Sequence, residues 1–228
     1  EFIRQGWSVK KMHKLMMLSS AYRMSSKIDA VAETKDPLNK LVHHMPIRRL
    51  EAEAIRDGIL AVSGRLNEKM FGPSVMPYLT PFMEGRGRPG SSGPLDGDGR
   101  RTIYTSVRRN FLVPMLSAFD FPVPFSCIGK RSVSNVPAQA LTLMNNPFVT
   151  QQAEFWAKRL LADNNLTDSG RVHAMYRSAF SREPDLKEEA DALKFIASQK
   201  LLLDNDNLKA WTDLCHVMFN VKEFIFIP

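Results

Sequence analysis

Residues 130–149 read KRSVSNVPAQALTLMNNPFV, and this stretch carries the densest signals for helix boundaries in the chain. A Ser-Asn pair lies shortly before Pro137. Proline is favoured in the first turn of a helix because its missing N–H would have no partner there. Asn146 and Pro147 repeat the arrangement, with asparagine as a typical N-cap. The stretch therefore predicts two successive helices, one beginning at Pro137 and the next at Pro147.

The helical pattern continues towards the end of the chain. Apolar residues recur at helical spacing in several further segments, one of them capped at Asp168, and Asp185 with Glu188 forms a capping box for another. Short connections between such segments favour antiparallel neighbours. We therefore expect a helical bundle over about residues 137–224. Two residues are expected in its core: Trp156 and Trp211.

The first half of the chain predicts fewer helices. Residues 8–22 and 46–66 each carry an apolar stripe at helical spacing, and Gly64 is placed to end the second helix. Within that helix Glu53 and Arg56 are three residues apart, as in a surface ion pair.

Residues 71–100 concentrate glycine and proline and lack apolar periodicity, which predicts a long and flexible loop. Residues 102–107 (TIYTSV) then favour a short strand. The predicted fold is therefore mainly α: one helical domain over residues 1–228, with a long irregular Gly/Pro-rich segment and at most a small β element.

Charge is unevenly distributed. The formal net charge of +7 arises from about +9 over residues 1–131 and −2 over residues 132–228. A basic half attracts polyanionic glycans, anionic lipid or nucleic acid, or it is simply a solvated arginine-rich surface. No nucleic-acid recognition motif supports a specific nucleic acid as the partner. No apolar run is long enough for a transmembrane segment.

Motifs for metals, cofactors and covalent catalysis are not apparent. Cys127 and Cys215 are far apart in sequence, and they form either one disulfide or two free thiols. His43 and His44 are adjacent and are expected to point apart, so we predict no metal site. The chain lacks C-x-x-C-H, G-x-S-x-G and a phosphate loop, so we predict no cofactor and name no catalytic residue.

Arginines are the main candidates for ligand binding, because a guanidinium presents a rigid fork to carboxylate, sulfate or phosphate. If they converge, they form an anion or glycan site. If each is paired with a nearby carboxylate, they hold the fold together instead. The arginines in question are Arg49, Arg108, Arg109 and Arg131, and the carboxylates are Glu51, Glu53, Asp57 and Asp120. We expect Arg108, Arg109 and Arg131 to approach the predicted helix at residues 46–66, which carries the first three of these carboxylates.

Two amides complete the candidate site. Gln139 lies near the start of the predicted helix at Pro137, and Asn145 lies near its end. Unlike Asn146, neither is explained by capping. They bind sugar hydroxyls, or they satisfy buried backbone groups of the neighbouring irregular chain.

Several strings of this sequence resemble the planctomycete-type domain of unknown function 1553. The similarity extends from Gly6 to Phe226, with modest departures such as Lys130, where the family commonly has arginine. The strings that carry it are MLSSAYRMSS, RRLEAEAIRDGILAVSG, SVRRN, KRSVSNVPAQALTLMNNPFV and AFSREPDLKEE.

The resemblance implies a C-terminal domain of a large secreted bacterial protein, often behind a cytochrome c-like domain, with no established activity. It implies a periplasmic or secreted location, and neighbouring domains of the same parent protein as partners. We accordingly expect the chain to be a piece of a larger protein. Three functions stay open: a non-catalytic scaffold or interaction domain, binding or hydrolysis of complex or polyanionic carbohydrate, and an accessory domain of a cytochrome c-containing redox protein.

Overall fold

The chain forms two compact units. A computed structural model describes residues 1–125 and 127–227. Unit 1 comprises Glu1–Arg49 with the last residues from Phe226, and unit 2 comprises Leu50–Ile225. The expectation of a single domain stays a prediction. The expected fold class is confirmed, since helices dominate and the described residues contain one two-stranded sheet.

Unit 1 contains two short helices and the sheet. Helix α1 is shorter than predicted, and its N-cap Ser8 accepts a hydrogen bond from the backbone N–H of Lys11 at 3.3 Å. None of the α1 side chains is buried, although its sequence is amphipathic. Strands β1 and β2 pair in antiparallel fashion. The elements of unit 1 are α1 (Val9–Met17), α2 (Ala30–Lys35), β1 (Arg48–Arg49) and β2 (Phe226–Ile227).

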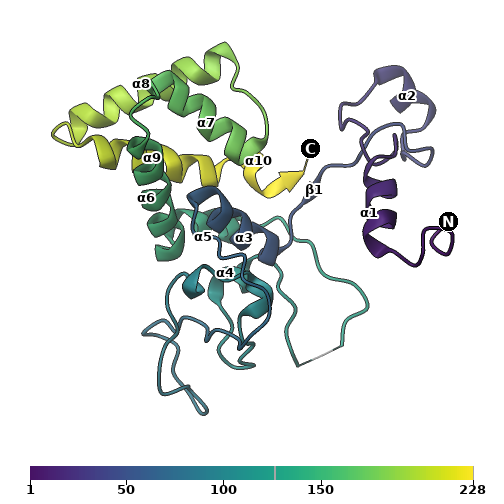
Figure 1. Ribbon diagram of the computed structural model, residues 1–228, viewed down its shortest axis with the longest axis horizontal. Coiled ribbons are helices and arrows are strands. Elements are labelled where there is room, and N and C mark those ends of the chain that lie inside the picture. The colour runs from purple at the N-terminus through teal and green to yellow at the C-terminus, as the bar shows by residue number, and fades with distance from the viewer. Residues whose placement is uncertain (126, 228) are drawn as a thin grey trace. The chain divides into compact units, whose positions relative to one another are not determined.

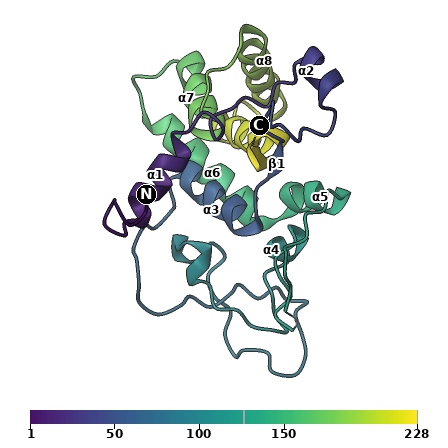
Figure 2. The same ribbon diagram turned by 90° about the vertical axis from the view of Figure 1, so that its right-hand side faces the viewer.

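Unit 2 is a bundle of helices with an irregular layer beside it. Helices α6 and α9 make extensive contact with each other, α8 lies against α9, and α3 lies against α6 (Figures 1 and 2). The bundle helices are α3 (Ala52–Ser63), α5 (Pro137–Asn145), α6 (Pro147–Ala162), α7 (Asp168–Phe180), α8 (Leu186–Leu202), α9 (Asn207–Asn220) and α10 (Lys222–Ile225).

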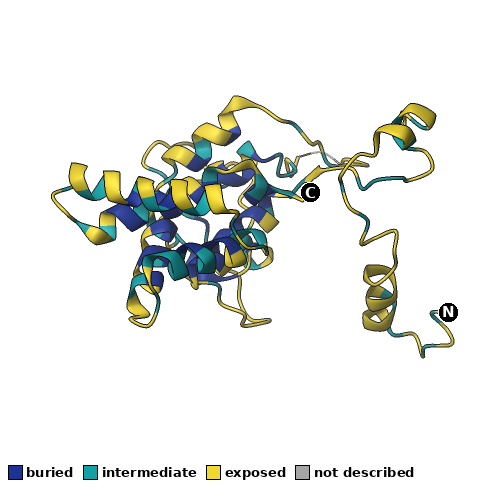
Figure 3. Ribbon diagram, turned by 90° about the horizontal axis from the view of Figure 1, so that it is seen from above, coloured by how far each residue is buried: buried dark blue, intermediate teal, exposed yellow. Residues whose placement is uncertain are grey.

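The core of unit 2 follows the α6–α9 contact, where buried residues concentrate (Figure 3). Trp156 and Trp211 are both fully buried, as predicted, and the ring of Trp156 lies 5.1 Å from that of Phe219. Ala153 and Ala210 are also fully buried, and small side chains of this kind let two helices approach closely. Large rings between small residues explain how these two helices form one well-packed interface.

Local signals set the helix boundaries of unit 2. Pro137 and Pro147 each occupy the first turn of a helix, and the Asn146 side chain accepts a hydrogen bond from the N–H of Phe148 at 2.9 Å. The capping box predicted at the start of α8 is present. One predicted cap is wrong. Thr167 caps α7 through its hydroxyl, and the acidic residue after it is the first residue of the helix.

The irregular layer covers residues 64–136 of unit 2. Its start is as predicted: Gly64 ends α3 with φ of +78°, a conformation that favours glycine. The predicted strand at residues 102–107 is wrong, because a single 3-10 turn forms there instead. The short helical elements of the layer are η1 (Gly97–Gly99), η2 (Thr102–Tyr104) and α4 (Pro114–Ala118).

The two cysteines are both free thiols: Cys127 is exposed, and Cys215 is buried in α9. Burial raises the pKa of the Cys215 thiol far above its ordinary value. Within the described residues, no helix combines the length and the apolar character needed to cross a bilayer, in agreement with the sequence.

The two buried tryptophans allow a test of the core. We expect Trp156→Ala and Trp211→Ala each to lower the free energy of unfolding by about 3–5 kcal/mol, because each leaves a large cavity between packed helices. Urea unfolding followed by circular dichroism measures this. Leu186→Ala is the control, since that side chain is 89% exposed. A tryptophan variant that unfolds like the control would contradict the packing described here.

Candidate functional site

Helix α3 carries the acidic wall of a pocket in unit 2. Its apolar side chains, Ile55 and Ile59 among them, are buried against the bundle. Glu53 and Asp57 are four residues apart and therefore lie on one face of the helix. That face is turned towards the irregular layer, and Glu51 lies just before the first turn.

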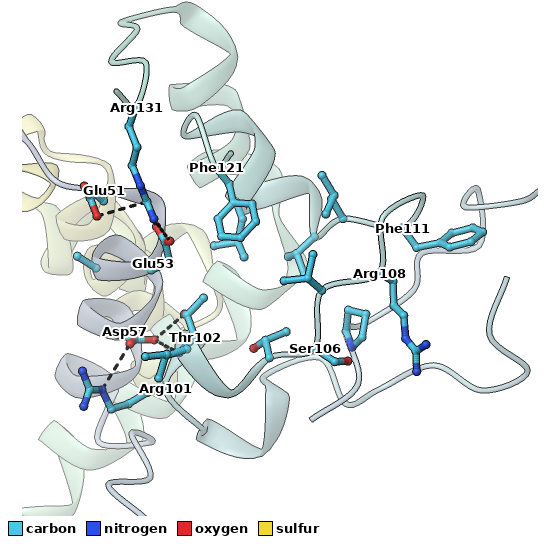
Figure 4. Close-up of a pocket in the computed structure, with 18 residues that line it drawn as sticks. Glu51, Glu53, Asp57, Arg101, Thr102, Ser106, Arg108, Phe111, Phe121 and Arg131 are labelled. Carbon is cyan, nitrogen blue, oxygen red and sulfur yellow. Dashed lines mark hydrogen bonds and ion pairs between the residues drawn. The ribbon is translucent and has the colours of Figure 1, made fainter. Parts of the chain in front are cut away.

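The pocket has a volume of about 490 Å³, within the usual range for ligand sites. One wall is α3, and the other is the chain from Arg101 to Val113 with the start of α4 (Figure 4). Charged groups gather on the α3 side, whereas the opposite side is largely apolar. The apolar lining residues are Ala54, Pro77, Ile103, Val107, Phe111, Leu112, Val113, Leu116 and Phe121.

Arg131 closes the acidic side of the pocket. Its two terminal nitrogens donate hydrogen bonds to the two carboxylate oxygens of Glu53 at 2.8 and 2.9 Å. Nη1 also lies 3.3 Å from a carboxylate oxygen of Glu51. This forked pairing is the strongest geometry available to an arginine and a carboxylate. The expected approach of Arg131 to this helix is therefore present.

The pair shifts both pKa values. Burial pushes the pKa of Glu53 upwards, but the hydrogen bonds from Arg131, a backbone hydrogen bond and the charge of Arg131 together hold that pKa below its ordinary value of 4.5. Hydrogen bonding to Glu53 raises the pKa of Arg131. Both groups are thus ionised at neutral pH, and each neutralises the other.

Asp57 is occupied by backbone and hydroxyl donors. The N–H and the hydroxyl of Thr102 donate to its Oδ1 at 2.8 and 2.6 Å. Arg101 lies 4.0 Å from the other carboxylate oxygen. Asp57 therefore fixes the start of the η2 turn, which explains why Thr102–Tyr104 form a turn where a strand was expected.

Arg56 attaches the irregular layer to α3 from inside the protein. It is only 6% exposed, and it donates hydrogen bonds to the carbonyl oxygens of Asp96 at 2.7 Å and Arg100 at 3.0 Å. A further hydrogen bond reaches the Thr102 hydroxyl at 3.0 Å. Burial lowers the pKa of Arg56, and the nearby charges of Asp57 and Asp96 oppose that effect. The prediction of a surface pair between Arg56 and Glu53 is thus wrong.

Gly97 makes this attachment possible. Its φ is +63°, and a Cβ placed on it would lie 2.6 Å from Nη2 of Arg56. Any other residue would collide with the guanidinium and would also be strained in that backbone conformation. The buried arginine therefore requires glycine at position 97.

Within unit 2, Arg108 and Arg109 are not assembled around Arg131, so their expected approach to α3 is not observed. Arg108 lines the pocket, but its guanidinium points away from α3 and donates to the sulfur of Met76 at 3.3 Å (Figure 4). Arg109 is exposed and lies outside the pocket. Arg49 belongs to strand β1 of unit 1.

The two predicted amides also lie elsewhere. Gln139 is 3% exposed and donates to the carbonyl and hydroxyl oxygens of Ser134 at 3.3 and 3.1 Å. Ser134 in turn donates its N–H and hydroxyl to Asp120. Asn145 donates to the carbonyl of Leu141 one turn earlier in its own helix. Gln139 thus satisfies groups of the irregular chain, one of the two roles considered from the sequence.

Sequence reasoning missed Arg56 and the role of Thr102. The signal for Arg56 was available. It lies one turn from both Ala52 and Ile59, on the buried face of α3, and an arginine there must find internal partners. No local signal identifies Thr102, because its partner is 45 residues earlier in the chain.

Comparison with protein families gives one match. The model of the family described as PSD1, protein of unknown function (DUF1553), matches residues 1–196 of this chain. The match therefore includes the pocket and ends within α8, so the resemblance beyond residue 196 stays a prediction. No curated protein and no solved structure matches the chain.

The buried arginine is tested by changing it and the glycine beneath it. We expect Arg56→Met to lower the free energy of unfolding by about 3–5 kcal/mol, because it removes the hydrogen bonds to the carbonyl groups of Asp96 and Arg100 and to the hydroxyl of Thr102. Arg56→Lys should not restore stability, since an ammonium cannot reproduce the fork.

Gly97→Ala should also lower the free energy of unfolding. Gly90→Ala is its matched control, because a Cβ at Gly90 meets open space. Urea unfolding of all four variants gives the comparison. Equal urea midpoints for the two glycine variants would show that the hydrogen bonds of Arg56 do not depend on the close approach of Gly97 to its guanidinium.

The ion pair of Arg131 is tested by pH. Arg131→Ala should lower the free energy of unfolding by about 1–2 kcal/mol at neutral pH, a value reduced for solvent exposure. The pKa of Glu53 is lowered in the folded state, so its contribution is complete above about pH 4.5 and is lost as pH falls through the folded value. The difference between wild type and variant should therefore shrink in acid.

Arg108→Ala is the control for this ion pair, because the Arg108 side chain is exposed and donates to a thioether. Chemical unfolding at several pH values and binding of a heparin oligosaccharide are measured on both variants. If Arg131→Ala keeps its stability and loses heparin binding, the arginine serves an anion site instead.

Proposed function

The chain belongs to the DUF1553 family, and on that premise we propose that it is a non-catalytic scaffold domain of a secreted or periplasmic multidomain bacterial protein. In this proposal the pocket beside α3 holds a polypeptide segment from a neighbouring domain of the same parent protein. The compartment and the multidomain context follow from the family resemblance of the sequence.

The observation that carries the proposal is the internal pairing of the pocket's charges. Among the described lining residues, three arginines accompany three carboxylates. Arg131 is bound by Glu53 and Glu51, and Asp57 accepts two hydrogen bonds from Thr102. Groups occupied in this way hold the two walls in place, and they leave little net charge to attract an ion.

The apolar side of the pocket supports polypeptide as the occupant. Ile103 is 77% exposed and Val107 is 53% exposed, so both offer apolar surface to a partner. Protein interfaces typically combine an apolar centre with a polar rim. Here the apolar wall lies beside Glu51, which is largely exposed, and Arg108. A peptide segment that inserts an apolar side chain and places polar groups at the rim fits this arrangement.

The carbohydrate alternative has weaker support. A polyanionic glycan requires arginines in excess of carboxylates, and the pocket lining has equal numbers. Gln139 and Asn145, the amides proposed to bind sugar hydroxyls, hydrogen-bond Ser134 and Leu141. The exposed Arg108 is the one observation that favours this alternative.

Photo-crosslinking in the complete parent protein tests the proposal. A benzophenone amino acid replaces Ile103, and in a control protein it replaces Leu186, which is 89% exposed on α8. We expect the probe at residue 103 to crosslink to a defined segment of the parent outside residues 50–225. Val107→Glu should remove that crosslink without changing the melting temperature, because Val107 lies at the exposed rim.

Other crosslinking results would contradict the proposal. Crosslinks from residue 103 only to residues 50–225, or the same products from residues 103 and 186, would show that the pocket holds no specific segment. Crosslinks to a separate protein would replace the scaffold role by recognition of an external partner. Retention on heparin that depends on Arg108 would favour the carbohydrate alternative.

A further inference from the structure

Three potential metal ligands meet in unit 1. Glu33 lies in α2, and His43 and His44 lie in the loop that follows. Each residue offers one ligand atom, and these atoms lie within 4.8 Å of one another. The two imidazole rings are 4.5 Å apart between centroids, so the prediction that these histidines point apart is wrong.

The loop before the histidines holds them in place. The Asp36 carboxylate accepts hydrogen bonds from the N–H groups of Lys40 and Leu41. The Asn39 side chain accepts from the N–H of His43 at 2.9 Å and donates to the carbonyl of His44 at 2.8 Å. Side-chain to backbone bonds of this kind fix a loop without regular secondary structure. The histidine backbone is therefore positioned independently of any ligand.

The ring contacts of His43 distinguish its two nitrogens. Nε2 lies 3.2 Å from the carbonyl oxygen of Asp36, which can accept only if Nε2 carries the proton. In that tautomer Nδ1 carries a lone pair, and it lies 3.3 Å from Nδ1 of His44. A histidine that donates one N–H to a backbone carbonyl and presents the other nitrogen is the usual arrangement of a metal ligand.

We propose that Glu33, His43 and His44 bind a divalent transition-metal cation, with zinc as the expected ion. Two nitrogens bound to tetrahedral zinc at about 2.0–2.1 Å lie about 3.3–3.4 Å apart. The two Nδ1 atoms are already separated by 3.3 Å. Two imidazoles with one carboxylate favour zinc over magnesium or calcium, which prefer oxygen ligands. Three protein ligands leave a tetrahedral ion one position for water.

The surroundings of the cluster suit a cation. His43 is largely buried, with its side chain 13% exposed, whereas the Glu33 side chain is 42% exposed. The Oε2 atom of Glu33 is itself shielded from solvent and lies 3.6 Å from Nε2 of His43, beyond hydrogen-bonding distance. Asp36 adds a second negative charge beside the histidines. A cation within reach of Glu33 would satisfy the shielded oxygen.

Metal titration of the whole chain tests the proposal. Cobalt(II) serves as a spectroscopic probe and zinc(II) is measured by calorimetry, in a Cys127→Ser background that removes the exposed thiol. We expect one ion per chain, bound in the micromolar range or tighter, with the intense visible bands of four-coordinate cobalt. Binding should weaken as the pH falls, because protons compete with the metal ion for its ligands.

Variants identify the ligands. Glu33→Gln, His43→Gln and His44→Gln should each weaken zinc binding by at least about tenfold, since loss of even an outer-shell partner has that effect. His13→Gln is the matched control, because it removes an exposed histidine from α1 of the same unit. Circular dichroism confirms that each variant keeps the helical content of the wild type.

Several outcomes would overturn the site. They are an absence of zinc binding by the wild type up to millimolar concentration, equal affinity in the three ligand variants and the control, or octahedral cobalt spectra unaffected by His43→Gln. If a single variant fails to fold, the remaining two and the cobalt spectrum still decide the question. Because the cluster lies in unit 1, none of these outcomes depends on the proposed role of the pocket.

Discussion

The buried guanidinium of Arg56 is the constraint on which the irregular layer of unit 2 depends. Apolar packing fixes α3 against the bundle, but residues 64–136 contain few apolar side chains that are buried. Arg56 compensates by binding the carbonyl groups of Asp96 and Arg100 and the hydroxyl of Thr102. A charge buried to this degree requires full hydrogen bonding, so the chain around it has little freedom to rearrange. That requirement holds the glycine-rich loop against α3, and the wall of the pocket begins directly after this loop, at Arg101.

Helix α3 holds the irregular layer through two further residues, Glu53 and Asp57. Arg56 is on the buried face of α3, whereas Glu53 and Asp57 are on the face towards the pocket. Each holds a different part of the irregular chain, Asp57 at Thr102 and Glu53 at Arg131. One helix therefore organises segments on both sides of α4 through polar contacts alone. The acidic residues of α3 act first as attachment points, which leaves the apolar wall as the part of the pocket available to a partner.

How well the sequence predicts a feature depends on how far apart in the chain the interacting residues are. Pro137, Asn146 and the capping box before α8 act within a few residues, and the sequence predicted the helices that they begin. The strand expected at residues 102–107 was wrong, because the partner of Thr102 lies in α3. Arg131 was identified because its motif and the acidic helix are both conspicuous. Helical spacing signalled the buried position of Arg56 in α3, but its partners at residues 96–102 lie 40 or more residues further along the chain. The meeting of His43 with His44 depends on loop geometry, for which periodicity carries no information.

The regularity of the backbone also decides where polar side chains cluster in this chain. Regular helices satisfy their own backbone groups, so their side chains are free to pack, and the buried faces of α6 and α9 form the core. Irregular segments must satisfy backbone groups with side chains, as Arg56 does for residues 96–100 and Asn39 does for the loop holding His43. Polar side chains therefore accumulate where the backbone is irregular. The pocket of unit 2 and the Glu33 cluster of unit 1 both arise beside such segments, because the residues that fix the loops also bring arginines, carboxylates and imidazoles together.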